Sequence, residues 1–474
     1  MTGRDELVFW LMLQALVFGW MLRRFCQRRA PSTGFPLAYV WLTFFGGWLP
    51  GLVHALPWYA SRDVDLAVVE ARYGFLAVAL FAIGCHLGSA RSGRRDAPAA
   101  ALHKGERRGS PDYGIFGCFA VTGLVTHFAL LPAFLGTPTV TAVLSSGAVL
   151  FMAGLLGAWW VAALNGDQKR SGLLWMVAAL AVPVTVFLSI AVTGFFGFGY
   201  LLFATLLALS LRARRLRARE AVTLPVLLFA ALSFYQTYMR DRPLLRGLTW
   251  AGAPYSVRLS QLWTTFTSPE WFDPFDAEHL AQITGRLGQG TLFGRVVQNL
   301  KSGFVEYAGG ETLVSAAYAL VPRAVWPEKP LRAGGHELVA RYSGLRFDEN
   351  TSVSLGLMFE LYVNFGTWGY AVGALLLGLF YGAADRRMWE HGLERDHRRF
   401  LVWFALGLSL LSGGEVVTLL PSTVVAVATA HAVSLVYDLF RAPVALAGYR
   451  YEMRGDACGA GGDCPELVGR ALRR

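Results

Sequence analysis

Charge, cysteine and metal-ligand motifs are all scarce in this chain. Only 16% of its 474 residues are charged, and its 5 cysteines are scattered. No cysteine lies in the segment 240–350, so no disulfide framework is expected there. Cys458 and Cys464 lack the spacing of a zinc knuckle and have no histidine near them. No HExxH, Walker, GxSxG or GxGxxG motif stands in a suitable context, so the sequence predicts neither a metal site nor a cofactor.

Long apolar runs are abundant instead, since 54% of the chain is hydrophobic. A helix needs about 20 apolar residues to cross a hydrocarbon core about 30 Å thick. The runs predict an all-α polytopic integral membrane protein with about eleven transmembrane helices. Their expected ranges are 7–22, 35–57, 73–90, 113–135, 143–164, 172–191, 194–211, 221–239, 366–384, 400–413 and 419–440.

Basic residues are divided unequally between the two sets of connections that join these helices. One set holds 28 of the 43 Lys and Arg residues, the opposite set holds 3, and the loop 240–365 holds the other 12. Because basic residues that flank spans stay in the cytoplasm, the N-terminus is predicted outside and the C-terminus inside. This placement accounts for the net charge of +11 without nucleic acid as a partner.

The expected organisation has four parts. Residues 1–239 would carry the spans up to the loop, and 240–365 would form a large extracytoplasmic loop with amphipathic or re-entrant helices before the third-last span. Residues 366–440 would carry the remaining spans, and 441–474 a cytoplasmic, disordered tail. A signal peptide is the alternative for the first span, but its basic cluster (Arg23, Arg24, Arg28 and Arg29) follows the apolar run.

The apolar run from Ser352 to Ala384 is too long for one crossing. Its 33 residues are interrupted only by Glu360 and Asn364, and as one helix they would measure about 50 Å. The first dozen residues are therefore expected to form an interfacial or re-entrant helix, with the span beginning near Gly366. Glu360 and Asn364, four residues apart, would share one face and point into protein or a wet cavity.

The segment VPRAVWPEKP, residues 321–330, combines rigidity with positive charge. Pro322, Pro327 and Pro330 exclude a regular helix and stiffen the backbone. Arg323 and Lys329 would then be held in a fixed relation that suits a phosphate or pyrophosphate group. An equally open interpretation is a juxtamembrane loop whose cations lie near lipid phosphates.

Four further side chains are candidates of lower specificity. Arg242 follows a predicted helix end, and Arg295 lies in a candidate amphipathic helix, LFGRVVQNLKSGFVEY; both are more simply explained as solvated surface charges. His336 follows the proline-rich segment and is a candidate general base. Glu415 is a candidate buried acid at an outer helix end, although exposure to water there is the favoured interpretation.

Two motifs together resemble a known family. The pattern PRxxWPxKP is followed by ExxxNFGxxG after a large outer loop, and the combination resembles the bacterial oligosaccharide repeat-unit polymerases of the O-antigen polymerase (Wzy-like) family. The specific part covers about 50 residues. The matching residues are Pro322, Arg323, Trp326, Pro327, Lys329, Pro330, Glu360, Asn364, Phe365, Gly366 and Gly369.

The resemblance implies a GT-C-like, metal-independent glycosyltransferase in the bacterial inner membrane, with its active site outside the cytoplasm. Its donor and acceptor would be polyprenyl-pyrophosphate-linked oligosaccharides, and its product O-antigen, capsule or exopolysaccharide. Membrane lipids and a chain-length regulator are the further expected partners. Arg323 and Lys329 would offset the charge of the leaving pyrophosphate, Glu360 would accept the hydroxyl proton, and Trp326 would line the sugar path. Asn364, Arg242, Arg295 and His336 would complete substrate binding.

Two other functions stay open. A transporter or flippase for the same lipid-linked glycans would be expected to show repeated halves and polar residues near the midplane. This chain shows no repeat, and its polar residues cluster at the outer end. An O-antigen ligase would share the architecture and the donor, and the sequence alone does not separate it from a polymerase.

Overall fold

The structure is a computed structural model that describes most of the chain. The described residues are 3–27, 31–90, 111–134, 137–195, 197–213, 218–288, 290–321, 325–326, 328, 335–347, 353–354, 356–411 and 413–457. Of the described residues, 83% are helical, and none forms a strand. The prediction of an all-α protein is confirmed.

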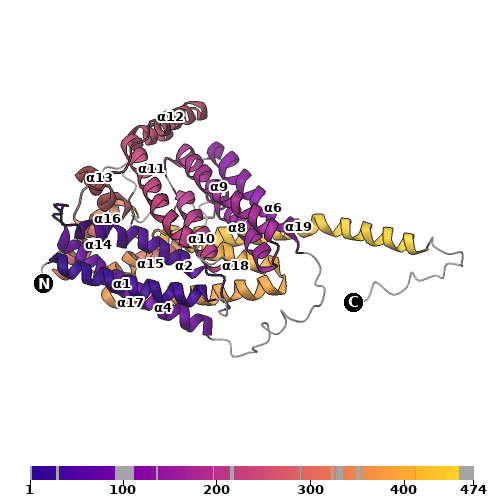
Figure 1. Ribbon diagram of the computed structural model, residues 1–474, viewed down its shortest axis with the longest axis horizontal. Helices are drawn as coiled ribbons and strands as arrows, with labels where there is room; N and C mark the ends of the chain where they lie inside the picture. Colours follow the sequence, from indigo (N-terminus) through magenta and orange to yellow (C-terminus); the bar gives the residue numbers. More distant parts are fainter. Residues whose placement is uncertain are drawn as a thin grey trace.

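The helices before the long loop form the first group in chain order (Figure 1). They are α1 (Gly3–Cys26), α2 (Pro36–Thr43), the π-helix η1 (Phe44–Trp48), α3 (Leu49–Ala55), α4 (Val64–Ala90), α6 (Tyr113–Leu124), the π-helix η2 (Val125–Leu130), the 3-10 helix η3 (Leu131–Phe134), α7 (Pro138–Ser145), α8 (Gly147–Leu164), α9 (Gln168–Thr193), α10 (Gly197–Ala213) and α11 (Ala218–Trp250).

The loop and the C-terminal part supply the second group. The loop carries α12 (Tyr255–Thr267), α13 (Ala277–Gln282), the π-helix η4 (Ile283–Leu287), α14 (Gly290–Lys301), α15 (Glu311–Ala319) and α16 (His336–Ser343). The C-terminal part consists of α17 (Leu357–Glu394), α18 (His397–Leu411) and α19 (Val416–Ala457). In Figure 1, α1, α4 and α17 run side by side, and α12 lies at the far edge beyond α9 and α11.

Eight of these helical segments are long and apolar enough to cross a membrane, so the protein is a multi-pass membrane protein. They coincide with eight of the predicted spans. The three other predicted spans, 194–211, 221–239 and 400–413, fall on α10, α11 and α18. α10 contributes a shorter apolar helix, Gly199–Ala213, and α18 has only 15 residues, about 22 Å. Crossing by these three helices stays a prediction.

Two predicted boundaries were wrong. Arg242 was expected just after a helix end, but α11 continues through Arg242 and Pro243 to Trp250. α11 continues because α12 folds back along it, with Phe266 stacked on Phe234 at 4.2 Å between ring centroids. The disordered tail was expected from residue 441, whereas α19 remains helical to Ala457.

The predicted spans 172–191 and 194–211 leave only two residues between them, and the chain turns near this point, between α9 and α10. α9 ends at Thr193, and Gly194 follows with φ +77° and ψ +12°, the left-handed conformation that glycine adopts without strain. α10 starts at Gly197. The nearly continuous apolar stretch 172–211, about twice the length of one span, is therefore divided between two helices.

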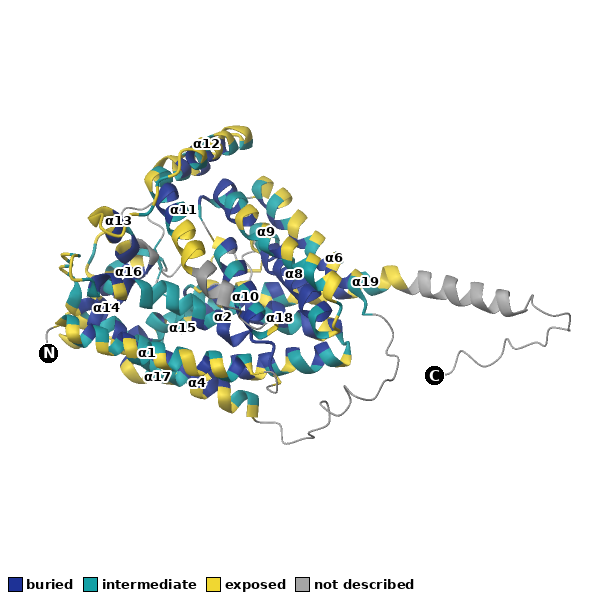
Figure 2. Cartoon of the chain, viewed as in Figure 1, coloured by how far each residue is buried: buried dark blue, intermediate teal, exposed yellow. Residues whose placement is uncertain are grey.

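The main buried core joins helices from both ends of the chain. It contains large side chains without exposed surface, among them Phe35, Phe119, Trp159 and Tyr381. A second buried cluster packs the loop helices α14 and α16 against α4 and α17, with Phe293 stacked on Phe359. Figure 2 shows the outward side of α12 as largely exposed, in contrast to the inner helices. The loop is therefore anchored on the bundle through its amphipathic helices.

α4 and α17 lie backbone against backbone, with glycines of each helix at the contact. Gly84 and Gly88 of α4 lie against the backbone of Leu379 in α17, and Gly378 and Gly382 of α17 lie against the backbone of α4 at Phe81 and Cys85. A Cβ atom at Gly378 would lie 2.2 Å from the carbonyl oxygen of Phe81, which no side chain tolerates. Small residues at this spacing let helices in lipid approach closely. The α4–α17 pair is therefore a tightly packed support for the residues at the N-terminal end of α17.

Gly378→Ala is expected to destabilise the protein by about 1–3 kcal/mol, because the two backbones must move apart. The measurement is the thermal unfolding midpoint of the purified protein in detergent. Gly19→Ala in α1, where no atom lies within 4 Å of the added Cβ, is the matched control. An unchanged midpoint for Gly378→Ala would show that the α4–α17 contact is looser than described.

Candidate functional site

α17 is broken near its start, where the length of the apolar run predicted a break. Phe365 (φ −134°, ψ 15°) and Gly366 (φ +63°, ψ −150°) are not helical. Leu361 then folds back onto the later part of α17, because its carbonyl oxygen and side chain lie against Gly369 and Gly373. We call residues 357–364 the half-helix and Phe365–Gly366 the elbow. The half-helix is thus folded back against the part of α17 that follows the elbow.

Three Gly-Gly pairs introduce the helices that meet the half-helix. Gly309–Gly310 precedes α15, Gly334–Gly335 precedes α16, and Gly413–Gly414 precedes the start of α19. All of these glycines that the structure describes have positive φ, from +57° to +113°. These five glycines turn the chain sharply just before a helix starts. The backbone N–H groups at helix starts lack partners within their own helix, and here they find side-chain acceptors.

Asn364 holds the start of α15. Its Oδ1 accepts a hydrogen bond from the Gly310 N–H at 2.9 Å, and its Nδ2 donates to Thr312 Oγ1 at 2.7 Å. Nδ2 also donates to the carbonyl oxygen of Glu360 at 2.8 Å. Asn364 is only 2% exposed, so these bonds satisfy an amide that would otherwise be costly to bury. Asn364 therefore fixes α15 on the half-helix.

Glu360 holds the start of α19. Its Oε2 accepts a hydrogen bond from the Val416 N–H at 2.6 Å, and the Thr312 side chain lies close to its carboxylate. The side chain is 1% exposed. A carboxylate at the start of a helix is favoured by the partial positive charge of the N–H groups there. The prediction that Glu360 and Asn364 share a buried face is confirmed.

Glu415 holds the start of α16. Both carboxylate oxygens accept from the Gly335 N–H, at 3.0 and 2.8 Å, across 80 residues of sequence. Glu415 is 2% exposed, so the favoured expectation that water surrounds it was wrong. The reason is that the Gly335 turn folds over the α19 start and supplies a donor. Glu415 lies close enough to Glu360 for their charges to interact.

The resulting polar cluster consists of Glu360, Asn364, Thr312, Glu415 and the backbone N–H groups of Gly310, Gly335 and Val416. Two carboxyl groups in it repel each other when both are ionised, so uptake of one proton is favoured electrostatically. The backbone N–H groups of Gly335 and Val416 donate to these carboxyl groups from fixed positions. Chemically, the cluster can hold or accept a proton in a place shielded from bulk water.

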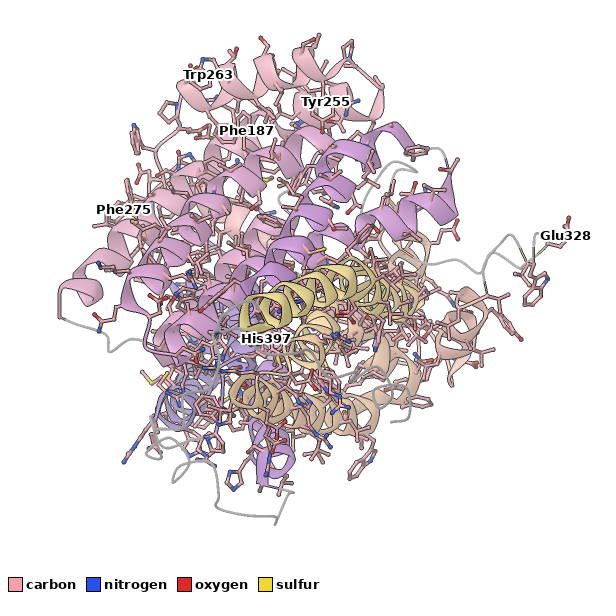
Figure 3. All side chains as sticks on the ribbon, turned by 90° about the vertical axis from the view of Figure 1, so that its right-hand side faces the viewer. Phe187, Tyr255, Trp263, Phe275, Glu328 and His397 are labelled. Atoms are coloured by element: carbon pink, nitrogen blue, oxygen red, sulfur yellow. The ribbon has the colours of Figure 1, made fainter. Side chains whose placement is uncertain are left out.

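The proline-rich segment lies beyond the far end of α15. Trp326 is 36% exposed and packs edge-on against Tyr318, with ring centroids 5.7 Å apart. Tyr318 is six residues after Thr312, about 9 Å along the helix axis. Glu328 projects away from the helical bundle (Figure 3). Arg323 and Lys329 lie outside the described residues.

The remaining candidates lie on three different helices, α16, α14 and α11. His336 is the first residue of α16 and follows Gly335 directly, so it borders the polar cluster. Arg295 is exposed on α14, whose other face is buried, which confirms the amphipathic helix but ends it at Lys301. Arg242 lies on α11, which packs mainly against α12 and α9. Within the described chain, no hydrogen bond or ion pair links Arg242 or Arg295 to the cluster.

Sequence reasoning missed Thr312, Gly310 and Gly335. The available signal was the repeated Gly-Gly pair followed by a polar residue: GGET at 309–312, GGHE at 334–337 and GGEV at 413–416. Among the described residues, no group of three or more His, Cys, Asp or Glu side chains is placed to hold a metal ion.

No protein-family model, no curated protein and no solved structure matches this chain. The fold and the polar cluster define a class: a helical, multi-pass membrane protein with a broken helix whose short arm buries an acid and an amide among three helix starts.

Proposed function

We propose that this protein is a membrane-embedded glycosyltransferase that polymerises polyprenyl-pyrophosphate-linked oligosaccharide repeat units at the outer face of a bacterial inner membrane. The observation that carries the proposal is the buried Glu360 on the half-helix, beside Asn364 and Glu415. A purely structural cap does not need two carboxyl groups in one shielded cluster, since each adds a desolvation cost. The resemblance of the two motifs to the O-antigen polymerase family supports the type of reaction, which is glycosyl transfer from a lipid-linked donor.

The proposed reaction is a displacement at the anomeric carbon of the donor glycan. The oxygen of an acceptor sugar hydroxyl forms a new bond to that carbon, and the bond from the carbon to the pyrophosphate oxygen breaks. The electron pair leaves with the pyrophosphate lipid, and the hydroxyl proton passes to the Glu360 carboxylate. Arg323 and Lys329 would offset the charge that develops on the leaving group. The product is a longer glycan on the acceptor lipid and a free polyprenyl pyrophosphate.

The function is tested by comparing envelope glycans of native cells that carry wild type, a deletion or Arg323→Ala. The proposal expects loss of the long-chain ladder in the deletion and in Arg323→Ala, with single repeat units persisting at the outer face. The measurement is gel electrophoresis with mass analysis of the extracted glycans. Arg346→Ala, at an exposed arginine of the same loop, is the control and should keep the ladder.

Other outcomes would contradict a polymerase. Repeat units trapped at the cytoplasmic face would indicate a flippase. Full-length polymer left unattached to its final acceptor would indicate a ligase. An unchanged ladder in the deletion, in cells shown to have no second polymerase, would exclude this glycan pathway.

A further inference from the structure

We infer that the elbow of α17 binds the phosphate group of a membrane lipid, using the ammonium of Lys301 and a cluster of tyrosine hydroxyls. This site lies beside the elbow, whereas the polar cluster of Glu360 lies on another side of the half-helix. The inference requires only that the protein spans a membrane, and it goes beyond the proposed transfer reaction.

Hydroxyl groups converge at the elbow from three parts of the chain. The Tyr73 hydroxyl of α4 lies 2.8 Å from Thr367 Oγ1, the first side chain after the elbow. Tyr307, from the loop before α15, packs against Gly366, and its hydroxyl lies 3.4 Å from the position of a Cβ there. Tyr362 approaches both tyrosines from the half-helix, with its ring centroid 5.2 Å from Tyr73 and 6.3 Å from Tyr307.

Tyr362 supplies a buried donor that is not used. Its side chain is 0% exposed, and its hydroxyl makes no hydrogen bond. The hydroxyl nevertheless lies close to those of Tyr73 and Tyr307. Burying a hydroxyl without a partner costs free energy, so such a group is informative in a well-packed region. A phosphate oxygen at the elbow would provide the missing acceptor.

Lys301 supplies the positive charge. It is exposed at the end of α14, and its Nζ lies 5.6 Å from the centre of the Tyr73 ring. No carboxylate within the described ranges forms an ion pair with it. The part of α17 that starts at Thr367 adds the partial positive charge of a helix N-terminus. The ammonium of Lys301 and the helix start at Thr367 therefore both attract an anion to the elbow.

Glu360, the acid of the half-helix, lies on the side of that helix opposite to the proposed phosphate site. Glu360 and Tyr362 are two residues apart, about 200° around a helix, so they lie on opposite sides. Glu360 is bonded to the start of α19, while Tyr362 lies among the tyrosines of α4 and the loop. The elbow can therefore hold an anion without direct repulsion by that carboxylate.

The surroundings favour a lipid over a soluble phosphate. Trp368 is 81% exposed beside the elbow, and Phe365 and Phe304 are also largely exposed. Trp368 belongs to a helix long and apolar enough to cross the membrane. Aromatic side chains at the level of lipid headgroups contact the upper part of the chains. A lipid whose phosphate lies at Lys301 would thus place its acyl chains against this exposed apolar surface.

The test is native mass spectrometry of the purified protein in detergent with three probes. Dioleoyl phosphatidic acid carries both the phosphate and the chains, dioleoylglycerol carries the chains alone, and inorganic phosphate carries the anion alone. Phosphatidic acid is expected to bind at least about tenfold more tightly than either of the others. Lys301→Gln and Tyr362→Phe should each weaken its binding about tenfold.

Lys169→Gln is the matched control, because Lys169 is an exposed lysine at the start of α9 and undergoes the same chemical change. Its binding should equal that of wild type. Tyr362→Phe removes a hydroxyl without a partner, so the unfolding midpoint of the lipid-free protein should not fall, and weaker binding would not reflect misfolding.

Three results would overturn the inference. The first is equal binding of phosphatidic acid by wild type, Lys301→Gln and Tyr362→Phe. The second is dioleoylglycerol binding as tightly as phosphatidic acid, which would mean that the chains alone are recognised. The third is inorganic phosphate binding as tightly, which would assign the site to a soluble anion. Phosphatidic acid is not a glycosyl donor, so none of these results depends on whether the protein polymerises glycans.

Discussion

Glu360→Gln is expected to lower the rate of glycan extension by about 10²- to 10⁴-fold, the usual contribution of a general base. Glutamine keeps an oxygen that can accept from the Val416 N–H and fills nearly the same volume. It cannot accept a proton from a sugar hydroxyl. The fold should therefore survive while the chemistry is lost, which separates a catalytic role from a structural one.

The measurement is the rate of polymer formation by the purified protein in vesicles supplied with lipid-linked repeat units. Glu306→Gln is the control, since Glu306 is an exposed acid in the loop that leads to α15. It should extend glycans at the wild-type rate. A folded Glu360→Gln protein with wild-type activity would eliminate Glu360 as the base and leave it as a cap of α19.

Gly366→Ala is expected to affect both stability and activity. Gly366 has φ +63° and ψ −150°, a conformation that is essentially restricted to glycine. An alanine there costs about 1–3 kcal/mol if the elbow is kept. If the elbow straightens instead, the half-helix moves and takes Glu360 and Asn364 from the starts of α19 and α15. In either case the unfolding midpoint should fall and glycan extension should be reduced.

Gly117→Ala is the control for this experiment. Gly117 lies within the regular helix α6, and no atom lies within 4 Å of an added Cβ. The same substitution is expected to raise stability there by about 0.5–1 kcal/mol, because alanine favours the helix. Thermal unfolding in detergent measures both variants. A Gly366→Ala protein as stable as Gly117→Ala would contradict the left-handed elbow.

The break in α17 shows how far an argument from length can reach. The thickness of a hydrocarbon core is fixed, so a 33-residue apolar run could not be a single straight crossing. Glu360 and Asn364, together with the glycine that follows them, indicated where the change of direction lies. The observed elbow is at Phe365–Gly366. A local rule sufficed because the constraint acts on one continuous segment.

The burial of Glu415 could not be predicted from the sequence around it. At the sequence level it is a helix-terminal acid beside two glycines, and nothing nearby in the chain covers it. Its burial depends on Gly335, 80 residues earlier, whose N–H donates to its carboxylate. Arg242 illustrates the same limit, because its helix continues only where α12 packs against α11. Contacts between distant segments override local signals in both cases.

The sequence by itself determined that the chain is an all-α membrane protein, where most of its long helices lie and where α17 bends. These properties follow from the length of each apolar segment, because every segment has to match the thickness of the bilayer independently of the others. Only the tertiary structure decided which polar groups meet: Glu360 with the start of α19, Asn364 with that of α15, and Glu415 with that of α16. The physical reason is that the N–H groups at helix starts have no partner within their own helix. They bond to acceptors that lie far away in the sequence, and only the folded chain brings these acceptors close.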